Sequence, residues 1–429
     1  MIQQVIKAKD ALAGFRRNRE ILKNFTFGNS DTQNILFNPS TKQQPLTNNL
    51  IHQLVKTLIG HFRDSMDSSV PVDHNRLPEI DSRMFEEFLI SGAAIQRISC
   101  ERRPGFDEHL MWVDNVSPAD FFAYPLRDPR ALDIEIIGMT HRWSIDEAIG
   151  RLMDGTHNSF VSLRNTLLNA AFDRTPGFER VSVIEVWHRE ITPVYRCHDR
   201  NLGTMTVLPE NKFHKIIKDN RNYRRGNLHK ISYKMEYVSR WVGRFMTADG
   251  IELRKIETDS HPFAVKFYPL LDGEIHSFVS GLVDQQKFVN RLVTMIDNVM
   301  STSAKGVLLF PQDEIAMGMN WDQVAERWSR FDGIIPYLPR PGSPGPHQVV
   351  TNMSDCGAYE LLNIQMDFFD RISGVSNALR GKSDGGNSAQ LFDAQTRNSL
   401  ASISDIFAAY RDFLHFRNLK LNTGNRSSE

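Results

Sequence analysis

The strongest constraint on the fold of this chain is the order of segments between residues 273 and 420. Apolar residues recur every three or four positions along 276–302, which predicts an amphipathic helix. A compact excursion, a second helix at 358–379, a glycine-rich loop and a last helix from 389 follow. That last helix, of about 30 residues, would span on the order of 45 Å. Long helices with apolar stripes on either side of an inserted module favour a subunit of a larger, ring-shaped assembly.

The excursion at 303–346 has a pattern of its own. The run VLLF predicts a strand, WDQVAERWSRF a helix and GIIPYL a second strand, and PRPGSPGP at 339–346 predicts a linker back to the helices. Trp321 and Trp328 lie seven residues apart on one face of that helix, with Arg327 and Arg330 beside them. The two tryptophans fit either a small core or a subunit contact.

The first half of the chain predicts a mixture of helices and antiparallel strands. A hairpin is expected from 94–100 and 109–116, because proline and glycine separate two β-rich runs. Ser144 and Glu147 form a capping box ahead of a helix. Alternating runs at 181–189, 193–197, 204–208 and 239–246 predict strands of a small barrel or a bent sheet. The fold class is therefore α+β.

Composition limits the functional classes. A length of 429 residues predicts two or more packed units. The charges balance at 51 basic and 51 acidic residues, whereas a protein that grips nucleic acid through phosphates usually carries a basic excess. Three cysteines without CxxC spacing indicate a reducing compartment and no cysteine-based zinc site. The sequence predicts no membrane span and no secretory signal.

The most tempting catalytic motif is Gly381-Lys382-Ser383, which matches the end of a phosphate-binding P-loop. Such a loop requires a glycine at the position of Ser376, and it follows a strand, whereas this one follows a helical pattern. We therefore expect a mobile loop that presents one lysine. Its residues are Gly381, Lys382, Ser383, Asp384, Gly385, Gly386 and Asn387.

A basic stretch at 212–234 carries eight Lys and Arg residues against one Asp, with Phe213, Tyr223 and Tyr233 between them. This pattern fits a nucleic-acid surface or a solvated connection that contacts protein. The basic residues are Lys212, Lys215, Lys218, Arg221, Arg224, Arg225, Lys230 and Lys234. No histidine motif predicts a metal ligand set, no residues are predicted to be catalytic, and no cofactor is expected.

Several ordered motifs resemble one family. They are His261-Pro262-Phe263, Asp272-Gly273, the run Gly281 to Gln286 with Asn290, the segment ISGVSNALRGKSDGGNSAQ, and WVDNVSPADFFAYPLRDP. Together they are similar to segments of the portal proteins of tailed bacteriophages, over about 93–416. The resemblance implies a portal-type fold with a mixed α/β wing, long stem and channel helices and a small α/β clip.

The resemblance also implies a division of the chain. Residues 1–274 would be the wing, 275–302 the first stem helix, 303–347 the clip, and 348–380 the second stem or channel helix. Residues 381–387 would be the tunnel loop, 388–420 the long wing helix, and 421–429 a short polar tail with the crown short or absent. Clip contacts would come from Trp321, Trp328, Arg327 and Arg330.

The function implied is a ring of about twelve subunits at one capsid vertex of the virion, assembled in the host cytoplasm. DNA would pass through the ring during packaging and ejection, and the clip would bind the terminase large subunit and then the head-tail adaptor. Major capsid and scaffolding proteins would be further partners, with no membrane. Two alternatives remain at this point: another ring-forming connector or minor head protein, and an ATP-dependent packaging enzyme.

Overall fold

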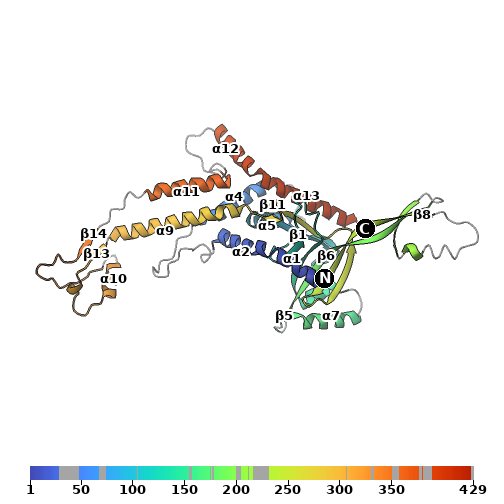
Figure 1. The fold of residues 1–429 in the computed structure, drawn as a ribbon, viewed down its shortest axis with the longest axis horizontal. Helices are drawn as coiled ribbons and strands as arrows, with labels where there is room; N and C mark the ends of the chain where they lie inside the picture. The colour runs from blue at the N-terminus through green and yellow to red at the C-terminus, as the bar shows by residue number, and fades with distance from the viewer. Residues whose placement is uncertain are drawn as a thin grey trace, which may run out of the picture. The chain divides into compact units, whose positions relative to one another are not determined.

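The structure is a computed structural model that divides into two compact units, shown in Figure 1. Unit 1 comprises Met1–Lys23, Leu58–Ser280 and Ser404–Glu429, and unit 2 comprises Asn24–Thr57 and Gly281–Ile403. Two units agree with the expectation from chain length. The residues described are 1–28, 48–66, 74–103, 105–153, 157–173, 175, 178–199, 204–210, 212–215, 231–305, 307–329, 333–349, 357–375, 379 and 389–426.

Unit 1 contains an antiparallel sheet of seven strands around the long pair β6 and β8. The strand order is β3-β4-β6-β8-β9, and β5 and β7 also pair with β6. Its strands are β3 (Phe121–Tyr124), β4 (Ile136–Ser144), β5 (Ala171–Asp173), β6 (Arg180–Asp199), β7 (Thr204–Pro209), β8 (Ile231–Thr247) and β9 (Glu252–Thr258). The sheet is open, with distinct edge strands. Of the two forms expected from the sequence, a small barrel or a bent sheet, the structure therefore has the bent sheet.

Strand β6 joins two of the predicted strands into one. Its register with β8 runs without a shift from Val183 opposite Thr247 to Asp199 opposite Ile231. Pro193, which lacks an N–H, does not interrupt it. This proline lies between the part of β6 that pairs with β4 and the part that pairs with β7. The missing N–H therefore breaks no hydrogen bond between strands.

A second sheet of three strands has the order β10-β1-β2. The predicted hairpin is confirmed as β1 (Ala93–Glu101) and β2 (Leu110–Asn115), with Ile98 opposite Val113. Strand β10 (Phe263–Phe267) pairs with the other edge of β1. A short ladder of β11 (Leu270–Leu271) and β12 (Glu274–Ile275) follows.

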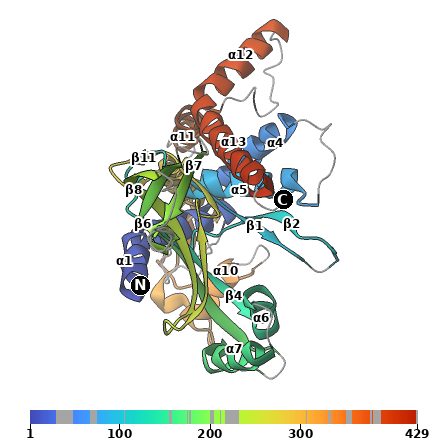
Figure 2. The ribbon, with the colours of Figure 1, turned by 90° about the vertical axis from the view of Figure 1, so that its right-hand side faces the viewer.

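Helices cover both faces of the larger sheet in unit 1. Helix α1 (Ile2–Ala11) packs Val5 and Ala8 against a cluster that includes Ile184 and Val186. Helices α6 (Ile145–Leu152) and α7 (His157–Asn169) pack on the opposite face, where Val181 and Val183 point (Figure 2). The predicted cap is confirmed, since the Ser144 hydroxyl accepts from the N–H of Glu147.

Helices α5 (Leu77–Ser91) and α13 (Ser404–Arg426) meet the three-stranded sheet in a buried core. Tyr410 is fully buried against Phe85 and Phe88, and its hydroxyl donates to the carbonyl oxygen of Asp81 at 2.6 Å. Arg417 donates to both carboxylate oxygens of Asp81 at 3.0 and 2.9 Å. Asp81 thus accepts hydrogen bonds from both Tyr410 and Arg417 of α13.

Unit 2 contains the predicted helices and the inserted module. Helix α9 (Val283–Lys305) follows the short helix η1 (Val279–Leu282), and α11 (Ala358–Ser373) and α12 (Ala389–Ser402) follow the module. The module itself holds β13 (Val307–Leu309), η2 (Gln312–Glu314), α10 (Trp321–Ser329) and β14 (His347–Val349). Helices α2 (Ala13–Phe27) and α4 (Leu50–Asp64) each have residues in both units.

The helix expected to run unbroken from 389 is interrupted at Ile403, between α12 and α13. The Ser402 hydroxyl lies 2.7 Å from the carbonyl oxygens of both Ser399 and Gly374. A serine that bonds to a carbonyl one turn back weakens the helical ladder and bends the helix. The sequence pattern alone missed this interruption, because a serine in a helix does not reveal its hydrogen-bond partner.

Candidate assembly sites

Helices α9 and α11 pack on each other and carry the inserted module at one end (Figure 1). Strand β13 begins two residues after α9 ends, and β14 pairs with it in antiparallel register, Val307 opposite Val349. The chain therefore leaves along α9 and returns along α11. The predicted order of helix, module and helix is confirmed as secondary structure.

Two residues of the Gly281–Asn290 motif form a buried polar network in unit 2. Gln286 is fully buried, and its amide oxygen accepts from the backbone N–H groups of Leu50 and Ile51 at 2.9 and 3.3 Å. Its amide nitrogen donates to the side-chain oxygen of Asn290, which also accepts from the N–H of Asn48. The pair thus caps the N-terminus of α4, where backbone donors lack partners within the helix.

Helix α11 exposes a stripe of large apolar side chains. Leu361, Ile364, Phe368 and Ile372 follow one another at intervals of three and four residues, so they share one face. Each is between 39% and 51% exposed. Phe369, one residue further, is only 1% exposed and faces the interior of the unit. We call the four exposed residues the α11 stripe.

Helix α9 shows the same division between two faces. Val289 and Leu292 are buried, whereas Phe288 and Met295, seven residues apart, are exposed. Surfaces of this kind, apolar along helices rather than scattered singly, mark sites of protein contact. The spacing of apolar residues in the sequence shows that α9 has apolar faces. Spacing alone cannot show which of these faces packs on the core of unit 2 and which is exposed.

The inserted module is small and leaves several apolar side chains in solvent. A bridge between Ile315 and Tyr337 and a hydrogen bond from the N–H of Leu338 to the carbonyl oxygen of Glu314 hold its middle together. Met317 and Ile334 are 96% and 82% exposed. The predicted strand at 333–338 is present only as that bridge, because residues around it pair with no further strand among those described.

The predicted clip contacts do not share one environment. Trp321 is exposed, with its ring edge-on to Phe310, whereas Trp328 is half-buried. Arg327 is exposed and donates to the carbonyl oxygen of Ile334. Gly333 lies so close to Arg327 that an added Cβ would come within 1.8 Å of its carbonyl oxygen. Arg330 lies outside the described residues.

The predicted tunnel loop, Gly381–Asn387, also lies outside the described residues, of which Leu379 and Ala389 are the nearest on either side. Helix α11 ends at Gly374, which has a φ of 68° and lies against Ser402, the last residue of α12. Val375, Leu379 and Ile403 are buried nearby in the chain. The described residues upstream of Gly381-Lys382-Ser383 form helix α11, and the described residues between α11 and the motif, 374, 375 and 379, form no strand.

Most of the basic stretch at 212–234 is likewise outside the described residues, which include Lys212, Lys215 and Lys234. All three are exposed, and the Lys234 ammonium lies 3.5 Å from Glu236. Phe213 is buried and stacks on Tyr195 with ring centroids 3.8 Å apart. Of the three interleaved aromatic residues, Phe213 therefore packs within the fold rather than offering its face to a base.

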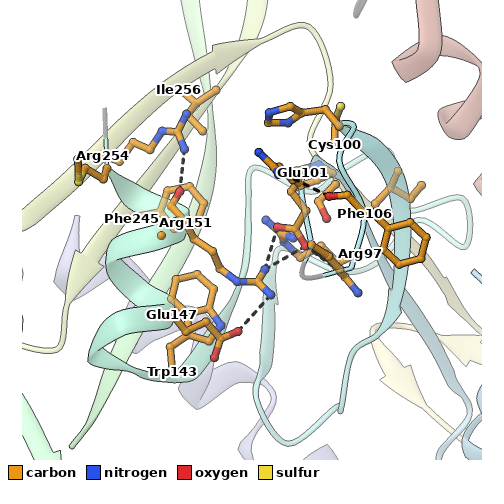
Figure 3. A pocket seen from close by; sticks show the side chains of 18 of the residues that line it. Arg97, Cys100, Glu101, Phe106, Trp143, Glu147, Arg151, Phe245, Arg254 and Ile256 are labelled. Atoms are coloured by element: carbon orange, nitrogen blue, oxygen red, sulfur yellow. Dashed lines mark hydrogen bonds and ion pairs between the residues drawn. The ribbon is translucent and has the colours of Figure 1, made fainter. Parts of the chain in front are cut away.

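Unit 1 has a cavity of about 1120 Å³ beside the β1–β2 hairpin (Figure 3). Arginines and carboxylates line it in paired arrangements. Arg151 bridges Glu101 at 2.9 Å and Glu147 at 3.1 Å, and Arg103 pairs with both Glu101 and Asp114. These pairs tie α6 to the hairpin. Several of the charges that line the cavity are therefore engaged in ion pairs within the fold.

Beneath the cavity lies a fully buried carboxylate. Glu185 accepts from Arg97 at 2.8 Å, His141 at 2.7 Å and Trp187 at 2.8 Å. Burial alone would raise its pKa, but the Arg97 charge and these hydrogen bonds outweigh burial and lower the pKa to about 2. Glu185 therefore has a structural role, because its carboxylate is ionised, hydrogen-bonded to three protein side chains and closed to solvent.

The His261-Pro262-Phe263 motif is held by α13. The Lys420 ammonium donates to the carbonyl oxygens of His261 and Phe263 at 2.7 and 2.9 Å. Burial lowers the pKa of Lys420 to about 7, and it also lowers the pKa of His261. These motif residues thus stabilise unit 1, and the same holds for Trp112, Phe121 and Phe122, which are buried.

Two chemical possibilities gain no support from the described part of the chain. Within it, no three His, Cys, Asp or Glu side chains gather in a way that would hold a metal ion. None of the helices it contains is both long and apolar enough to cross a membrane.

The exposed helical stripes are surfaces of the kind that mediate contacts between proteins. Residues 71–417 match the model of the phage P22-like portal protein family. The match covers well over half of the chain, so the chain belongs to this family, which confirms the resemblance seen in the sequence. A search of curated proteins returned no matching relative.

Proposed function

We propose that this phage portal protein forms a ring of about twelve subunits at one capsid vertex, through which the genome enters and leaves. The observation that carries the proposal is the α11 stripe. Four large apolar side chains on one helix face water in the single chain, and burying such a surface contributes roughly 25 cal/mol per Å². A neighbouring copy in a ring would cover them, because a head-to-tail interface that closes generates a ring.

The proposed parts follow the chain. Residues 1–274 serve as the wing, α9 and α11 as stem and channel helices, 303–347 as the clip, 381–387 as the tunnel loop, and 388–420 as the return into the wing. The exposed Met317 and Ile334 support a docking role for the clip, in which terminase binds first and an adaptor later. The balanced charge supports a conduit in which DNA slides without being gripped.

Electron microscopy of the purified chain tests the ring. End-on views with a central hole and about twelvefold symmetry are expected in negative stain. Particles without a hole, or a population of single chains at every concentration, would refute the proposal. The variant Ile364→Asp with Phe368→Asp should form fewer rings, because charges in a buried apolar contact are unfavourable.

Deletion of the clip separates its role from that of the rest of the chain. Chains lacking 303–347, joined by a short glycine-serine linker, should still form rings but should not support terminase docking or DNA packaging. A packaging reaction that proceeds with the deleted chain would show that the module is not the docking site.

Replacement of the single loop lysine tests the tunnel-loop assignment. Lys382→Ala should leave ring formation unchanged, since an exposed charge contributes little to folding. It should alter DNA packaging or retention, because a ring brings many copies of that lysine close to the phosphates. Ser383→Ala in the same loop is the matched control and should behave as wild type. Equal behaviour of both variants would argue against a DNA contact at Lys382.

A further inference from the structure

Strands β7, β6 and β8 form a three-stranded ribbon whose two outer edges are open. From Tyr233 to Arg240, β8 pairs only with β6 among the described residues, because β9 reaches no further than Trp241. Within the part of the chain that the structure describes, β7 likewise pairs only with β6. An unpaired strand edge is a template for pairing with another chain.

The register identifies which backbone groups point outward. The N–H of Arg189 donates to the carbonyl oxygen of Glu135, on the side of β6 away from β8. Backbone direction alternates along a strand, and the β6–β8 register has no shift. The odd-numbered residues of β8, from Tyr233 to Ser239, therefore direct N–H and C=O away from β6. On β7 the same alternation leaves Met205 and Val207 facing outward.

The open edges carry few of the features that normally protect such edges, namely Lys234 on β8 and Pro209 at the end of β7. Tyr233, Met235 and Tyr237 are between 43% and 68% exposed, and Met205 and Val207 are 69% and 53% exposed. Protective edges usually carry lysine, proline or inward-pointing charges. Here Lys234 and Arg196 both pair with Glu236, so the charges of the ribbon are engaged with one another.

The two edges are also matched in direction. Both β7 and β8 run antiparallel to β6, so they are parallel to each other. A second copy placed beside the first in the same orientation would bring its β7 against the first copy's β8 and leave its own β8 free for the next copy. This is a heterologous contact, the kind that closes into a ring.

We propose that β8 of one copy pairs in parallel with β7 of the next, so that the ribbons join into a continuous sheet between subunits. This inference rests on the proposed ring, and it names the surface and the partner: a second copy of this chain. Backbone hydrogen bonds would hold the contact, and the exposed residues of the edges would cover one another.

The face on which each side chain lies distinguishes this parallel arrangement from an antiparallel one in which one copy is flipped. Thr206 and Tyr233 both lie opposite Cys197, so they share a face of the ribbon, and Leu208 and Met235 share it with them through Tyr195. A parallel, head-to-tail contact keeps that face continuous and sets Met235 beside Thr206 or Leu208. A flipped copy, whose β7 runs antiparallel to β8, sets Met235 beside Met205 or Val207 instead.

Disulfide crosslinking tests the inference. The background carries Cys100→Ser, Cys197→Ser and Cys356→Ser, and removal of Cys197 is essential because it lies opposite Thr206 within one chain. Met235→Cys is combined with Thr206→Cys, Leu208→Cys, Met205→Cys or Val207→Cys. Mild oxidation of assembled protein should yield ladders of linked chains for Thr206→Cys or Leu208→Cys, since opposite residues in a sheet suit disulfide geometry.

A control and two other outcomes of the crosslinking experiment distinguish failure of this inference from failure of the proposed ring. Met235→Cys alone should give no dimer, and a dimer there would mean that β8 pairs with β8. Ladders only with Met205→Cys or Val207→Cys, or no crosslinks in rings seen by microscopy, would overturn the inference while leaving the ring intact. Absence of rings in the cysteine-free background and in wild type would instead count against the proposed function.

A backbone variant gives an independent readout. Met235→Pro removes one outward N–H without touching the β6 ladder, whereas Met235→Ala removes the side chain and keeps the N–H. Rings of the proline variant should dissociate at least tenfold faster on dilution than rings of the alanine variant. Equal dissociation of the two variants would rule out pairing through this edge.

Discussion

The core between α5 and α13 in unit 1 and helix α11 in unit 2 differ in how far they bury their large apolar side chains. In unit 1, Phe85, Phe88, Tyr410 and Phe413 are all buried, and the charged groups near them are paired. In unit 2, α11 buries Phe369 but exposes the α11 stripe along its neighbouring face. The first arrangement is that of a core complete within one chain. The second is that of a surface that a partner completes.

The difference also appears in the polar interior. Unit 1 buries the Asp81–Arg417 pair and the Glu185 cluster with their hydrogen bonds satisfied, an arrangement that fixes one packing. In unit 2 the Gln286–Asn290 network caps a helix end, and exposed apolar residues occupy the outer faces. Mutations in the buried core of unit 1 should therefore act on folding, whereas mutations on the outer faces of unit 2 should act on assembly, as should mutations on the open edges of β7 and β8.

The largest effect is expected from breaking the buried ion pair of unit 1. Arg417→Met leaves the Asp81 carboxylate without its cation, and loss of one partner of a buried pair costs about 3–5 kcal/mol. Chemical denaturation followed by tryptophan fluorescence should show this loss. Arg411→Met, an exposed position on the same helix, is the control and should change the free energy of unfolding by less than about 0.5 kcal/mol.

Adjacent phenylalanines on α11 sharpen the comparison within one helix. Phe369→Ala should lower the free energy of unfolding by about 3 kcal/mol, because it removes a fully buried ring. Phe368→Ala should leave folding nearly unchanged and instead lower the stability of the ring. The two readouts are denaturation and the ring fraction by light scattering, and an equal folding defect in both variants would remove the distinction.

Acid should destabilise unit 1 through Glu185. Its pKa is about 2 in the folded chain and lies at its ordinary 4.5 when unfolded, so its contribution is complete above pH 4.5 and is lost as the pH falls towards 2. The difference in unfolding free energy between wild type and Glu185→Gln should therefore shrink by about 3 kcal/mol over that window. A difference that stays constant with pH would mean that the carboxylate is not held ionised.

The smallest effect concerns the cap in unit 2. Gln286→Leu keeps the volume but removes the side-chain acceptor of the N–H groups of Leu50 and Ile51, which costs about 1–3 kcal/mol. Gln285→Leu, one position earlier, is the control. Hydrogen exchange of the first turn of α4 measures the effect directly, and unchanged protection of Leu50 and Ile51 would contradict the role given to Gln286.

Sequence patterns predicted the helices, strands and caps better than they predicted the tertiary contacts of these elements. The hairpin of β1 and β2, the Ser144 cap and the order from α9 to α12 follow from local spacing and turn residues, and all are present. The break at Ile403 was missed because it depends on the contact of Ser402 with Gly374, 28 residues away. Periodicity likewise could not show that Phe369 is buried while Phe368 is exposed.

The candidate sites were predictable to a lesser degree. The α11 stripe and the open edges of β7 and β8 become visible only when packing shows which faces remain uncovered. Gln286 and Asn290 stood out as part of a motif, but their partner, the start of α4, lies more than 230 residues away in the sequence. Such contacts depend on tertiary structure, which local propensity does not encode.

Native mass spectrometry of the purified chain, alongside the Ile364→Asp, Phe368→Asp variant, tests the central claim most directly. The claim is that the exposed surface of unit 2 is an assembly surface. Wild type should show one closed species of about twelve 49.2 kDa subunits, and the variant should shift to single chains with an unchanged denaturation profile. A wild type that stays monomeric at every concentration, or a variant that assembles as well as wild type, would contradict the account.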